Sequence, residues 1–258
     1  MIPRIIHYCW FGQNPLPPLA VKCIESWKRY CPGYEIKEWS EDNFDIHCCQ
    51  YVEEAYSAKK WAFVTDYVRL YVLKEFGGIY MDNDVEVLKP LDRFLVHPAF
   101  SGFEQQTSIP TGIIASEKKN LWISHLLSYY KERSFIKPDG NYDFTTNVEI
   151  ITKMTTQKYR FTPNNTYQQL SNDVVLYPTE YFCPKNYLTG ETILTINSHT
   201  IHHFNGSWLT RTQKIKTKIR KAFGEKIWNI LFNIKNSILY KIFIIFTLIT
   251  TISKLGQY

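Results

Sequence analysis

The sequence lacks the spaced cysteine pairs that hold zinc in small metal-binding modules. Its 6 cysteines never occur as C-x-x-C, so we expect no zinc cluster. No internal repeat and no low-complexity segment is present, which argues against a repeat architecture. No secretion leader is visible at the start of the chain. We therefore expect reduced thiols and a protein that faces the cytoplasm.

Acidic residues are nearly absent from the end of the chain. Residues 211–258 contain one acid, Glu225, against ten Lys and Arg, which gives them a formal charge of +9 although the whole chain carries only +6. Residues 1–210 carry −3, which argues against a nucleic-acid-binding core. With 258 residues and 45% hydrophobic content, the chain can bury one substantial core. We therefore predict one domain over 1–210 and a basic tail over 211–258.

The tail also lacks an apolar run long enough to cross a membrane. Its near-continuous apolar stretch, 242–252, is shorter than the ~18–20 residues that a spanning helix needs. A basic run at 211–221 precedes an amphipathic pattern of Ile and Leu at helical spacing. These features favour a helix lying on an anionic membrane surface. The alternative is a helix pair that covers the domain or forms a dimer contact.

The first forty residues predict an α/β arrangement. Arg4–Trp10 has the apolar pattern of a buried strand, Leu19–Arg29 has helical spacing, and Tyr34–Trp39 alternates as a second strand. A strand, helix and strand in this order favour a sheet that binds a nucleotide at the carboxyl ends of its strands.

An Asp-x-Asp motif follows the next predicted strand. A helix over Tyr56–Phe76 stops at Gly77, and a short apolar strand then leads into Asp82 and Asp84. Side chains at i and i+2 of an extended chain share a face, so both carboxylates can bind one hard cation such as Mn²⁺ or Mg²⁺. Alone, this tripeptide is a common chance match.

Two charged residues in the preceding helix strengthen the case. Asp66 and Arg69 lie three apart and therefore share a helix face. The helix descends about 16 Å from Asp66 to its end, and the strand climbs back about 13 Å. If the strand doubles back, Asp66, Arg69, Asp82 and Asp84 meet in one cleft. The alternative is a surface ion pair of little energetic value, but apolar neighbours indicate burial, where a charge needs a partner.

The segments 61–69 and 77–84 together resemble the signature of the family-32 glycosyltransferases. That family includes bacterial capsule and surface polysaccharide transferases, and the catalytic domains of large glucosylating toxins are related to it. Residues 5–12 are similar to the family's first strand, and 201–208 to its closing motif. The resemblance implies a GT-A type nucleotide-diphospho-sugar transferase fold over 1–210, followed by a C-terminal helical tail.

The resemblance also implies a metal site. Asp84 would bind the ion directly, while Asp82 would contact the donor's ribose or sugar or reach the ion through water. His203 is the predicted third ligand, because a short loop can bring its imidazole and the Ser207 hydroxyl or backbone carbonyls to the same ion. His202 would face the other way if this stretch is extended. The alternative is two histidines packed at a strand end.

The nucleotide would lie at the end of the first strand. Trp10 ends that strand, and an indole face stacks on any base; in the toxin-like relatives, a tryptophan here stacks on uracil. We predict that Asn43 and Thr65 contact the base or the ribose.

The remaining predicted residues surround the reacting bond. Asp66 can hold sugar hydroxyls, and Arg69 can neutralise phosphate charge as the bond opens. By resemblance, Trp208 donates its indole N–H to the leaving phosphate. Tyr80 is predicted to touch the sugar or phosphate. A packed core role is the alternative for both Tyr80 and Trp208.

These observations predict a metal-dependent, retaining glycosyltransferase. It would move a hexose from a nucleoside diphosphate sugar, with UDP favoured, to a surface polysaccharide or lipid-linked oligosaccharide acceptor at the inner face of a membrane. The resemblance implies front-face attack with the departing phosphate as base. The alternatives are a protein-glycosylating toxin or effector and a non-catalytic sugar-binding module.

Overall fold

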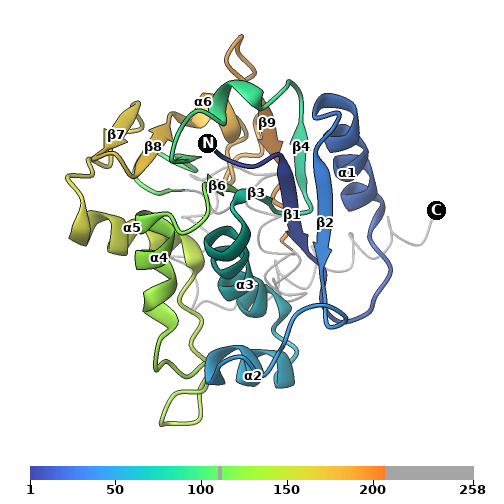
Figure 1. The fold of residues 1–258 in the computed structure, drawn as a ribbon, viewed down its shortest axis with the longest axis vertical. Helices are drawn as coiled ribbons and strands as arrows, with labels where there is room; N and C mark the ends of the chain where they lie inside the picture. Colours follow the sequence, from blue (N-terminus) through green and yellow to red (C-terminus); the bar gives the residue numbers. More distant parts are fainter. Residues whose placement is uncertain (110–111, 207–258) are drawn as a thin grey trace, which may run out of the picture. The chain divides into compact units, whose positions relative to one another are not determined.

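The computed structural model describes residues 1–109 and 112–206. Within Met1–Asn186 and Thr192–Trp208, the described residues form one compact α/β unit around a central sheet (Figure 1). Residues 187–191 group separately, and 187–189 form a turn. The predicted boundary at residue 210 and the tail lie outside the described residues. Among the described residues, no helix has the length and apolar character to cross a bilayer.

The first strand, helix and second strand are confirmed. β1 (Ile5–Cys9) pairs in parallel with β2 (Glu35–Trp39), in a register that sets Ile5 against Glu35 and Cys9 against Trp39. Four of the five β1 residues are buried, as expected for a strand covered on both faces. The crossover helix α1 (Pro18–Tyr30) begins at a proline, which is favoured in a first helical turn.

The single helix predicted over 56–76 is wrong at its start. The structure has two helices, α2 (Gln50–Ser57) and α3 (Trp61–Phe76), separated by a turn in which Lys59 has φ +55°. The end of α3 is as predicted: Gly77 and Gly78 have φ +69° and +107°. A Cβ on Gly78 would lie 2.7 Å from the Ile5 carbonyl oxygen, so this turn requires glycine.

β3 (Gly78–Met81) lies near the middle of a seven-stranded mixed sheet. The strand order is β2-β1-β3-β6-β5-β8-β7, in which β1, β2 and β3 are parallel neighbours and β6 runs antiparallel to both β3 and β5. The additional strands are β5 (Ala99–Gly102), β6 (Ile113–Ser116), β7 (Gln168–Leu170) and β8 (Val174–Tyr177).

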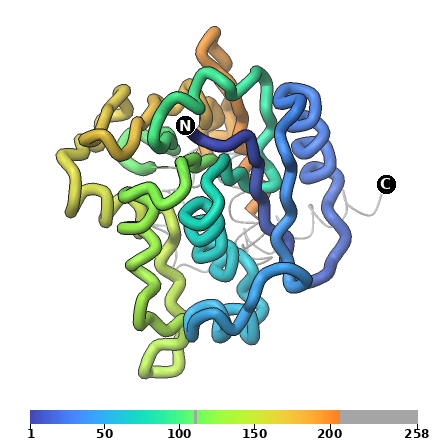
Figure 2. The backbone as a smooth tube through the Cα atoms, in the orientation of Figure 1, coloured from blue at the N-terminus to red at the C-terminus, as the bar shows by residue number. Residues whose placement is uncertain are grey.

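Two apolar cores cover the faces of this sheet. One contains buried side chains of α2, α3, α4 (Leu121–Leu127) and α5 (Asn147–Lys158), and the other those of α1, the 3₁₀ turn Asp92–Phe94 and α6 (Thr179–Phe182). A second 3₁₀ turn, Ser128–Tyr130, follows α4. Successive residues of β3 divide between the cores: Tyr80 joins the first, while Ile79 and Met81 join the second. The tube in Figure 2 shows α3 and α1 on opposite sides of β1 and β3.

A separate two-stranded ribbon was not predicted. β4 (Val85–Val87) pairs antiparallel with β9 (Thr200–His202), in a register that sets Val85 opposite His202. This pairing brings residues more than a hundred positions apart directly beside the Asp-x-Asp motif.

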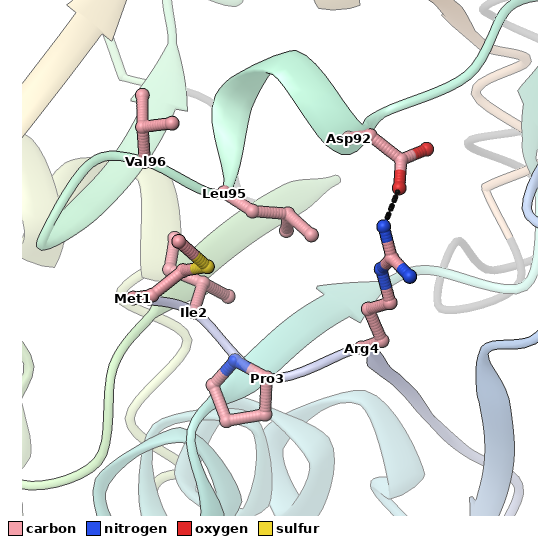
Figure 3. A pocket seen from close by; sticks show the side chains of 7 residues that line it. All are labelled: Met1, Ile2, Pro3, Arg4, Asp92, Leu95 and Val96. Atoms are coloured by element: carbon pink, nitrogen blue, oxygen red, sulfur yellow. Dashed lines mark hydrogen bonds and ion pairs between the residues drawn. The ribbon is translucent and has the colours of Figure 1, made fainter.

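A hollow of about 670 Å³ lies at the amino end of β1, whereas the predicted nucleotide site lies at its carboxyl end. It is lined by the N-terminal residues and by Leu95 and Val96, with Arg4 Nη2 2.8 Å from Asp92 Oδ1 at its margin (Figure 3). This hollow precedes β1, whereas the predicted site lies past the opposite end of the strand. A five-residue strand separates the two by about 16 Å.

Candidate functional site

Asp82 and Asp84 lie in the turn between β3 and β4, beside His202, the last residue of β9. Each offers a carboxylate oxygen that, with one ring nitrogen of His202, forms a group whose atoms all lie within 4.8 Å of one another. The Asp84 Oδ1 to His202 Nε2 distance is 3.2 Å. Two carboxylates and an imidazole at this spacing could hold one divalent cation.

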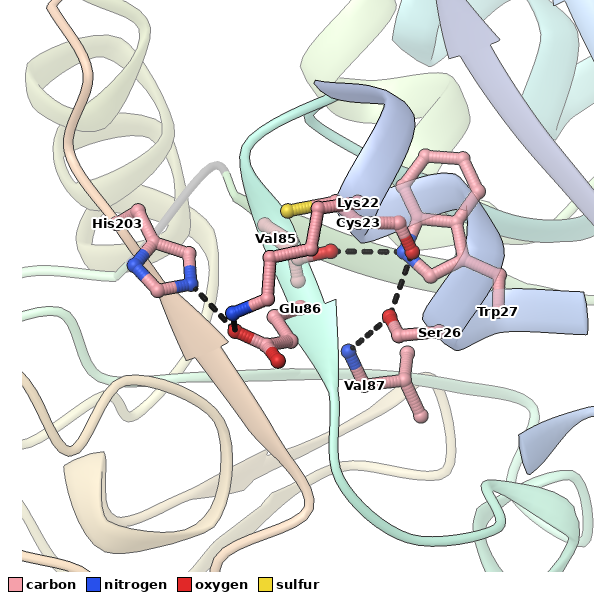
Figure 4. A network of polar contacts seen from close by, with 8 residues as sticks. All are labelled: Lys22, Cys23, Ser26, Trp27, Val85, Glu86, Val87 and His203. Atoms are coloured by element: carbon pink, nitrogen blue, oxygen red, sulfur yellow. Dashed lines mark hydrogen bonds and ion pairs between the residues drawn. The ribbon is translucent and has the colours of Figure 1, made fainter. Parts of the chain in front are cut away.

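The histidine that the structure places beside Asp82 and Asp84 is His202, not His203, the predicted third ligand. His202 is the last residue of β9, and its ring turns toward Asp84. His203 points the other way, and its Nε2 lies 2.8 Å from Glu86 Oε2, which also accepts from Lys22 Nζ at 3.0 Å (Figure 4). Consecutive residues of an extended chain face opposite sides. The structure thus brings the other member of the pair to the two aspartates.

Helix α1 holds the ribbon in place. Trp27 Nε1 donates to the Val85 carbonyl at 2.7 Å, and the Val87 N–H donates to Ser26 Oγ at 2.9 Å (Figure 4). These bonds satisfy the edge of β4 that faces away from β9. The ribbon that places Asp84 beside His202 is therefore held from both sides of β4.

The electrostatics of the pair reflect a buried, closely spaced acid and base. Burial by itself raises the pKa of Asp84. The charge on His202 and the hydrogen bond from the Asn205 N–H to Oδ2, at 2.7 Å, have the larger combined effect and lower this pKa to about 2. Burial lowers the pKa of His202, but Asp84 and the Cys183 thiol outweigh it and raise the pKa well above 6.5. Without a metal, the pair is thus an ion pair.

Arg69 connects the helix to the Asp-x-Asp motif. Its Nη2 lies 3.2 Å from Asp66 Oδ1 and 3.2 Å from Asp82 Oδ1, and the side chain is only 5% exposed. Its guanidinium carbon is 4.7 Å from the centre of the Tyr80 ring, and the Tyr80 hydroxyl donates to Asp82 Oδ1 at 2.9 Å. The predicted convergence of α3 and β3 is confirmed.

Asp66 has a further partner that the sequence did not predict. Asn147, the first residue of α5, donates from Nδ2 to Asp66 Oδ1 at 3.1 Å. Burial raises the pKa of Asp66 to about 7, although Arg69 and Asn147 both act to lower it. A signal for the start of a helix exists at Thr146, but nothing local shows that this helix end reaches α3.

The sequence around this site matches a known protein family. A sequence model described as "Glycosyltransferase sugar-binding region containing DXD motif" matches residues 17–101. That segment contains Asp66, Arg69, Asp82 and Asp84. Over residues 17–101, the sequence therefore matches the DXD glycosyltransferase family.

Characterised and solved relatives are distant. Inositol phosphoceramide mannosyltransferase 3 of Schizosaccharomyces pombe is 32% identical over 120 residues, 43% of this chain and 31% of the relative. The uncharacterized glycosyltransferase L373 of Acanthamoeba polyphaga mimivirus is 26% identical over 201 residues, 72% of this chain and 74% of the relative. Among solved structures, the PaToxG glycosyltransferase has a TM-score of 0.46 and 20% identity, over 61% of this chain and 70% of its own. The chain thus spans about a third of the yeast protein's length.

Trp10 directly follows β1. Its backbone N–H donates to the Trp39 carbonyl at 2.8 Å, which continues the β1–β2 pairing by one residue. The indole N–H donates to the Asn14 carbonyl, and the ring is half-buried. Trp10 therefore lies at the carboxyl edge of the parallel strands, the edge at which β3 leads into Asp82 and Asp84.

Asn43 and Thr65 have local contacts. Asn43 closes the loop after β2, because Nδ2 donates to the Glu38 carbonyl at 2.8 Å and Oδ1 accepts from the Ser40 N–H at 3.0 Å. Thr65 is half-buried on α3, and its carbonyl accepts from Arg69 Nε at 3.4 Å. Their predicted base or ribose contacts remain predictions.

Two predicted residues, Ser207 and Trp208, lie outside the described residues. Besides Asn147, another residue near the site was not predicted. Glu104 follows β5, and burial raises its pKa. The charge of His202 acts to lower that pKa, and the charge of Asp82 acts to raise it. A lone glutamate after an apolar strand gives no sequence signal for this position.

Proposed function

We propose that the protein is a metal-dependent, retaining glycosyltransferase that transfers a hexose from a nucleoside diphosphate sugar, with UDP favoured. The observation that carries the proposal is the continuous array from Asp66 through Arg69 to Asp82, Asp84 and His202. The array offers a cation site beside a guanidinium and a buried carboxylate. A diphosphate and a sugar need those three groups in that order.

The residues fit a divalent cation of the Mn²⁺ or Mg²⁺ class. Asp82 and Asp84 supply hard carboxylate oxygens, and His202 supplies a nitrogen once it releases its proton. The buried Nδ1 of His202 has no hydrogen-bond partner among the described residues, and Nε2 faces Asp84 Oδ1 at 3.2 Å. A bound ion would supply Lewis acidity and neutralise charge on the departing diphosphate.

The chain's own residues would orient the donor. Arg69 already balances two carboxylates, and its fixed guanidinium would donate to phosphate oxygens as charge develops there. Asp66 would accept hydrogen bonds from the sugar. Trp10 would stack on the base at the end of β1. We include retention at the transferred carbon in the proposal, with the departing phosphate accepting the acceptor's proton.

The acceptor in our proposal is a glycan or a lipid-linked oligosaccharide, as in capsule or surface polysaccharide synthesis. The name of the yeast relative gives mannose as the transferred sugar and an inositol phosphoceramide as the lipid acceptor, which supports a hexose and a membrane-bound acceptor. The charge of residues 211–258, +9, supports placement on the inner face of an anionic membrane.

Donor hydrolysis tests the proposal. Full-length protein would be incubated with a panel of UDP- and GDP-sugars in Mn²⁺, Mg²⁺ or EDTA, and the released diphosphate measured. We expect turnover that requires the cation and that Asp84→Asn abolishes, because the amide keeps the shape but loses the charge. Turnover that survives exhaustive chelation would contradict metal dependence.

The panel also separates the rival functions. A non-catalytic sugar-binding module would bind a nucleotide sugar, seen as a thermal shift, without hydrolysing it. A toxin or effector would transfer sugar to protein rather than to glycan or lipid-linked acceptors. The anomeric configuration of the product, read by NMR, tests retention.

A further inference from the structure

Glu104 has a carboxylate that the described part of the protein leaves without a partner. The residue is half-buried, and burial raises its pKa. Within residues 1–109 and 112–206, no hydrogen bond or ion pair reaches its carboxylate oxygens, although its backbone N–H is bonded. A carboxylate withdrawn from water without a compensating donor is costly, and beside a cation site it indicates a functional position.

The backbone around Glu104 is fixed on both sides. The fully buried Phe103 donates its N–H to the carbonyl of the last residue of β8 at 2.8 Å, and Glu104 donates its own N–H to the Ser108 carbonyl at 2.9 Å. Beyond this turn, the Ile109 N–H donates to Thr152 Oγ1 of α5 at 3.1 Å. Glu104 therefore has a defined position between β5 and α5.

The sheet register places Glu104 beside His202. The β3–β6 pairing continues to Asp82, whose N–H donates to the Gly112 carbonyl at 2.9 Å. The β5–β6 pairing, continued past the end of β5, places Glu104 one residue beyond the level of Gly112. A Cβ on Gly112 would lie 2.8 Å from His202 Nδ1, so the imidazole packs against the middle strand. Because adjacent strands are ~4.8 Å apart, the backbones of Asp82 and Glu104 flank His202.

Glu104 faces the cation group without joining it. The charges of His202 and Asp82 both act on its carboxylate, so it lies near them. Among the described residues, however, the group whose atoms lie within 4.8 Å of one another consists of Asp82, Asp84 and His202 alone. An ionised carboxylate can accept about four hydrogen bonds. That capacity is left for a group bound beside the cation.

The order of the strands indicates which part of the substrates comes near Glu104. At the carboxyl edge, β1 leads into Trp10, β3 into the Asp-x-Asp motif and β5 into Glu104, with β6 between the last two strands. In the proposed function, the base lies at Trp10 and the diphosphate at the motif. Glu104 therefore lies on the side of the diphosphate away from the base. Because Asp66 is assigned to the transferred sugar, the group left to be placed at Glu104 is the acceptor.

The charge of this position selects the kind of acceptor. Glu104 and the two aspartates of the motif make the approach acidic, which disfavours a carboxylate or a phosphate. Sugar hydroxyls are neutral donors, and a carboxylate oxygen accepts hydrogen bonds from them. An uncharged sugar therefore fits the position better than a uronic acid or a sugar phosphate.

We propose that Glu104 forms the acceptor subsite, where its carboxylate accepts hydrogen bonds from hydroxyls of an uncharged sugar at the end of the acceptor. This inference rests on the proposed function and names the class of its acceptor. The hydroxyl that Glu104 holds is a neighbour of the attacking one, because the attacking hydroxyl gives its proton to the departing phosphate.

The test separates transfer from hydrolysis. Full-length wild type and Glu104→Gln would be given Mn²⁺, the donor that wild type hydrolyses fastest, and octyl glycosides of glucose, galactose and mannose, with octyl glucuronide as the acidic counterpart. We expect wild type to use at least one neutral glycoside, and the glucuronide about tenfold less well. Glu104→Gln should lower kcat/KM for the neutral acceptor about tenfold or more. Hydrolysis without acceptor and the Kd of the nucleoside diphosphate with Mn²⁺ should stay within about twofold.

Deoxy acceptors and two further variants exclude a merely structural role. Wild type should lose about tenfold in kcat/KM when one particular acceptor hydroxyl is removed, and in Glu104→Gln the same removal should cost little. Glu104→Asp, which keeps the charge, should retain more transfer than Glu104→Gln. Glu35→Gln is the matched control, because Glu35 is an exposed glutamate at the amino end of β2, and its substitution should change none of these values.

Four results would overturn the inference. Equal losses of hydrolysis and transfer in Glu104→Gln would place Glu104 on the donor or the cation. Transfer within about twofold of wild type, with the deoxy penalty kept, would make Glu104 structural. A wild type that hydrolyses a donor but transfers to no neutral glycoside would refute the acceptor class and leave the proposed donor chemistry standing. If wild type hydrolyses no donor with any cation, the proposed function and this inference both fail.

Discussion

Replacing Asp66 by Asn should stabilise the protein at neutral pH while removing its activity. The folded-state pKa of Asp66 is about 7, against 3.8 for an ordinary aspartate, chiefly because the side chain is buried. The folded protein therefore holds this proton at pH values where the unfolded chain has released it. The ionised Asp66 carboxylate, to which we assign sugar binding, therefore lowers the free energy of unfolding at neutral pH.

The size and sign of the effect follow from that difference. Because the unfolded chain binds fewer protons between pH 4 and pH 7, the free energy of unfolding falls as pH rises through this window. A shift of about three units at ~1.4 kcal/mol each gives about 4 kcal/mol by pH 8, and no effect well below pH 4. For a protein of this size that corresponds to about 8–16 °C in Tm.

The measurement is the difference in unfolding free energy between Asp66→Asn and wild type from pH 4 to pH 8, in EDTA. Taking the difference cancels the titration of all other groups that the substitution leaves unchanged. Asp42→Asn, at an exposed loop position, controls for the loss of one negative charge. A difference that does not change with pH would refute the reasoning, since burial would then not hold the proton on Asp66.

Three further predictions test the other parts of the site. His202→Gln should weaken Mn²⁺ binding about tenfold or more by calorimetry, whereas His203→Gln should stay within about threefold because it can still bond Glu86; equal losses would contradict the corrected ligand. Trp10→Ala should weaken binding of the free nucleoside diphosphate about tenfold if stacking is worth ~1–3 kcal/mol, and an unchanged affinity would return Trp10 to the core. Truncation after Trp208 should retain donor hydrolysis but abolish flotation with anionic vesicles, an attraction that salt weakens; aggregation of the truncated protein, with no lipid binding by the full chain, would make the tail part of the fold.

The elements that could be predicted are those with strong local signals. β1, α1 and β2 were found within about one residue because the periodicity of their apolar residues is clear in all three. The stop after α3 was found because two glycines with positive φ leave no alternative. The break before α3 was missed because Lys59 has no residue-type signal for the left-handed conformation it adopts.

The half of the site built on α3 and β3 could be predicted, because only one reversal of the chain separates these two elements. Asp66, Arg69 and Asp82 lie within seventeen residues, and the rise per residue of a helix and a strand is enough to bring them level. Asn147 could not be found in this way. Its contact with Asp66 spans 81 residues and depends on how α5 packs against α3 and α4, which no local pattern encodes.

The histidine pair shows that a local rule is not enough when the register of the two strands is unknown. Alternation along an extended chain was correctly applied: His202 and His203 do face opposite sides. The sequence gives no means to decide which side faces Asp84, because that depends on the register of β4 against β9, and β4 is only three residues long. A shift of one residue would exchange the two histidines. The register is fixed by tertiary contacts, among them Trp27 of α1 on the Val85 carbonyl and Glu86 on His203. Which histidine lies beside Asp82 and Asp84 is therefore decided by residues outside this group.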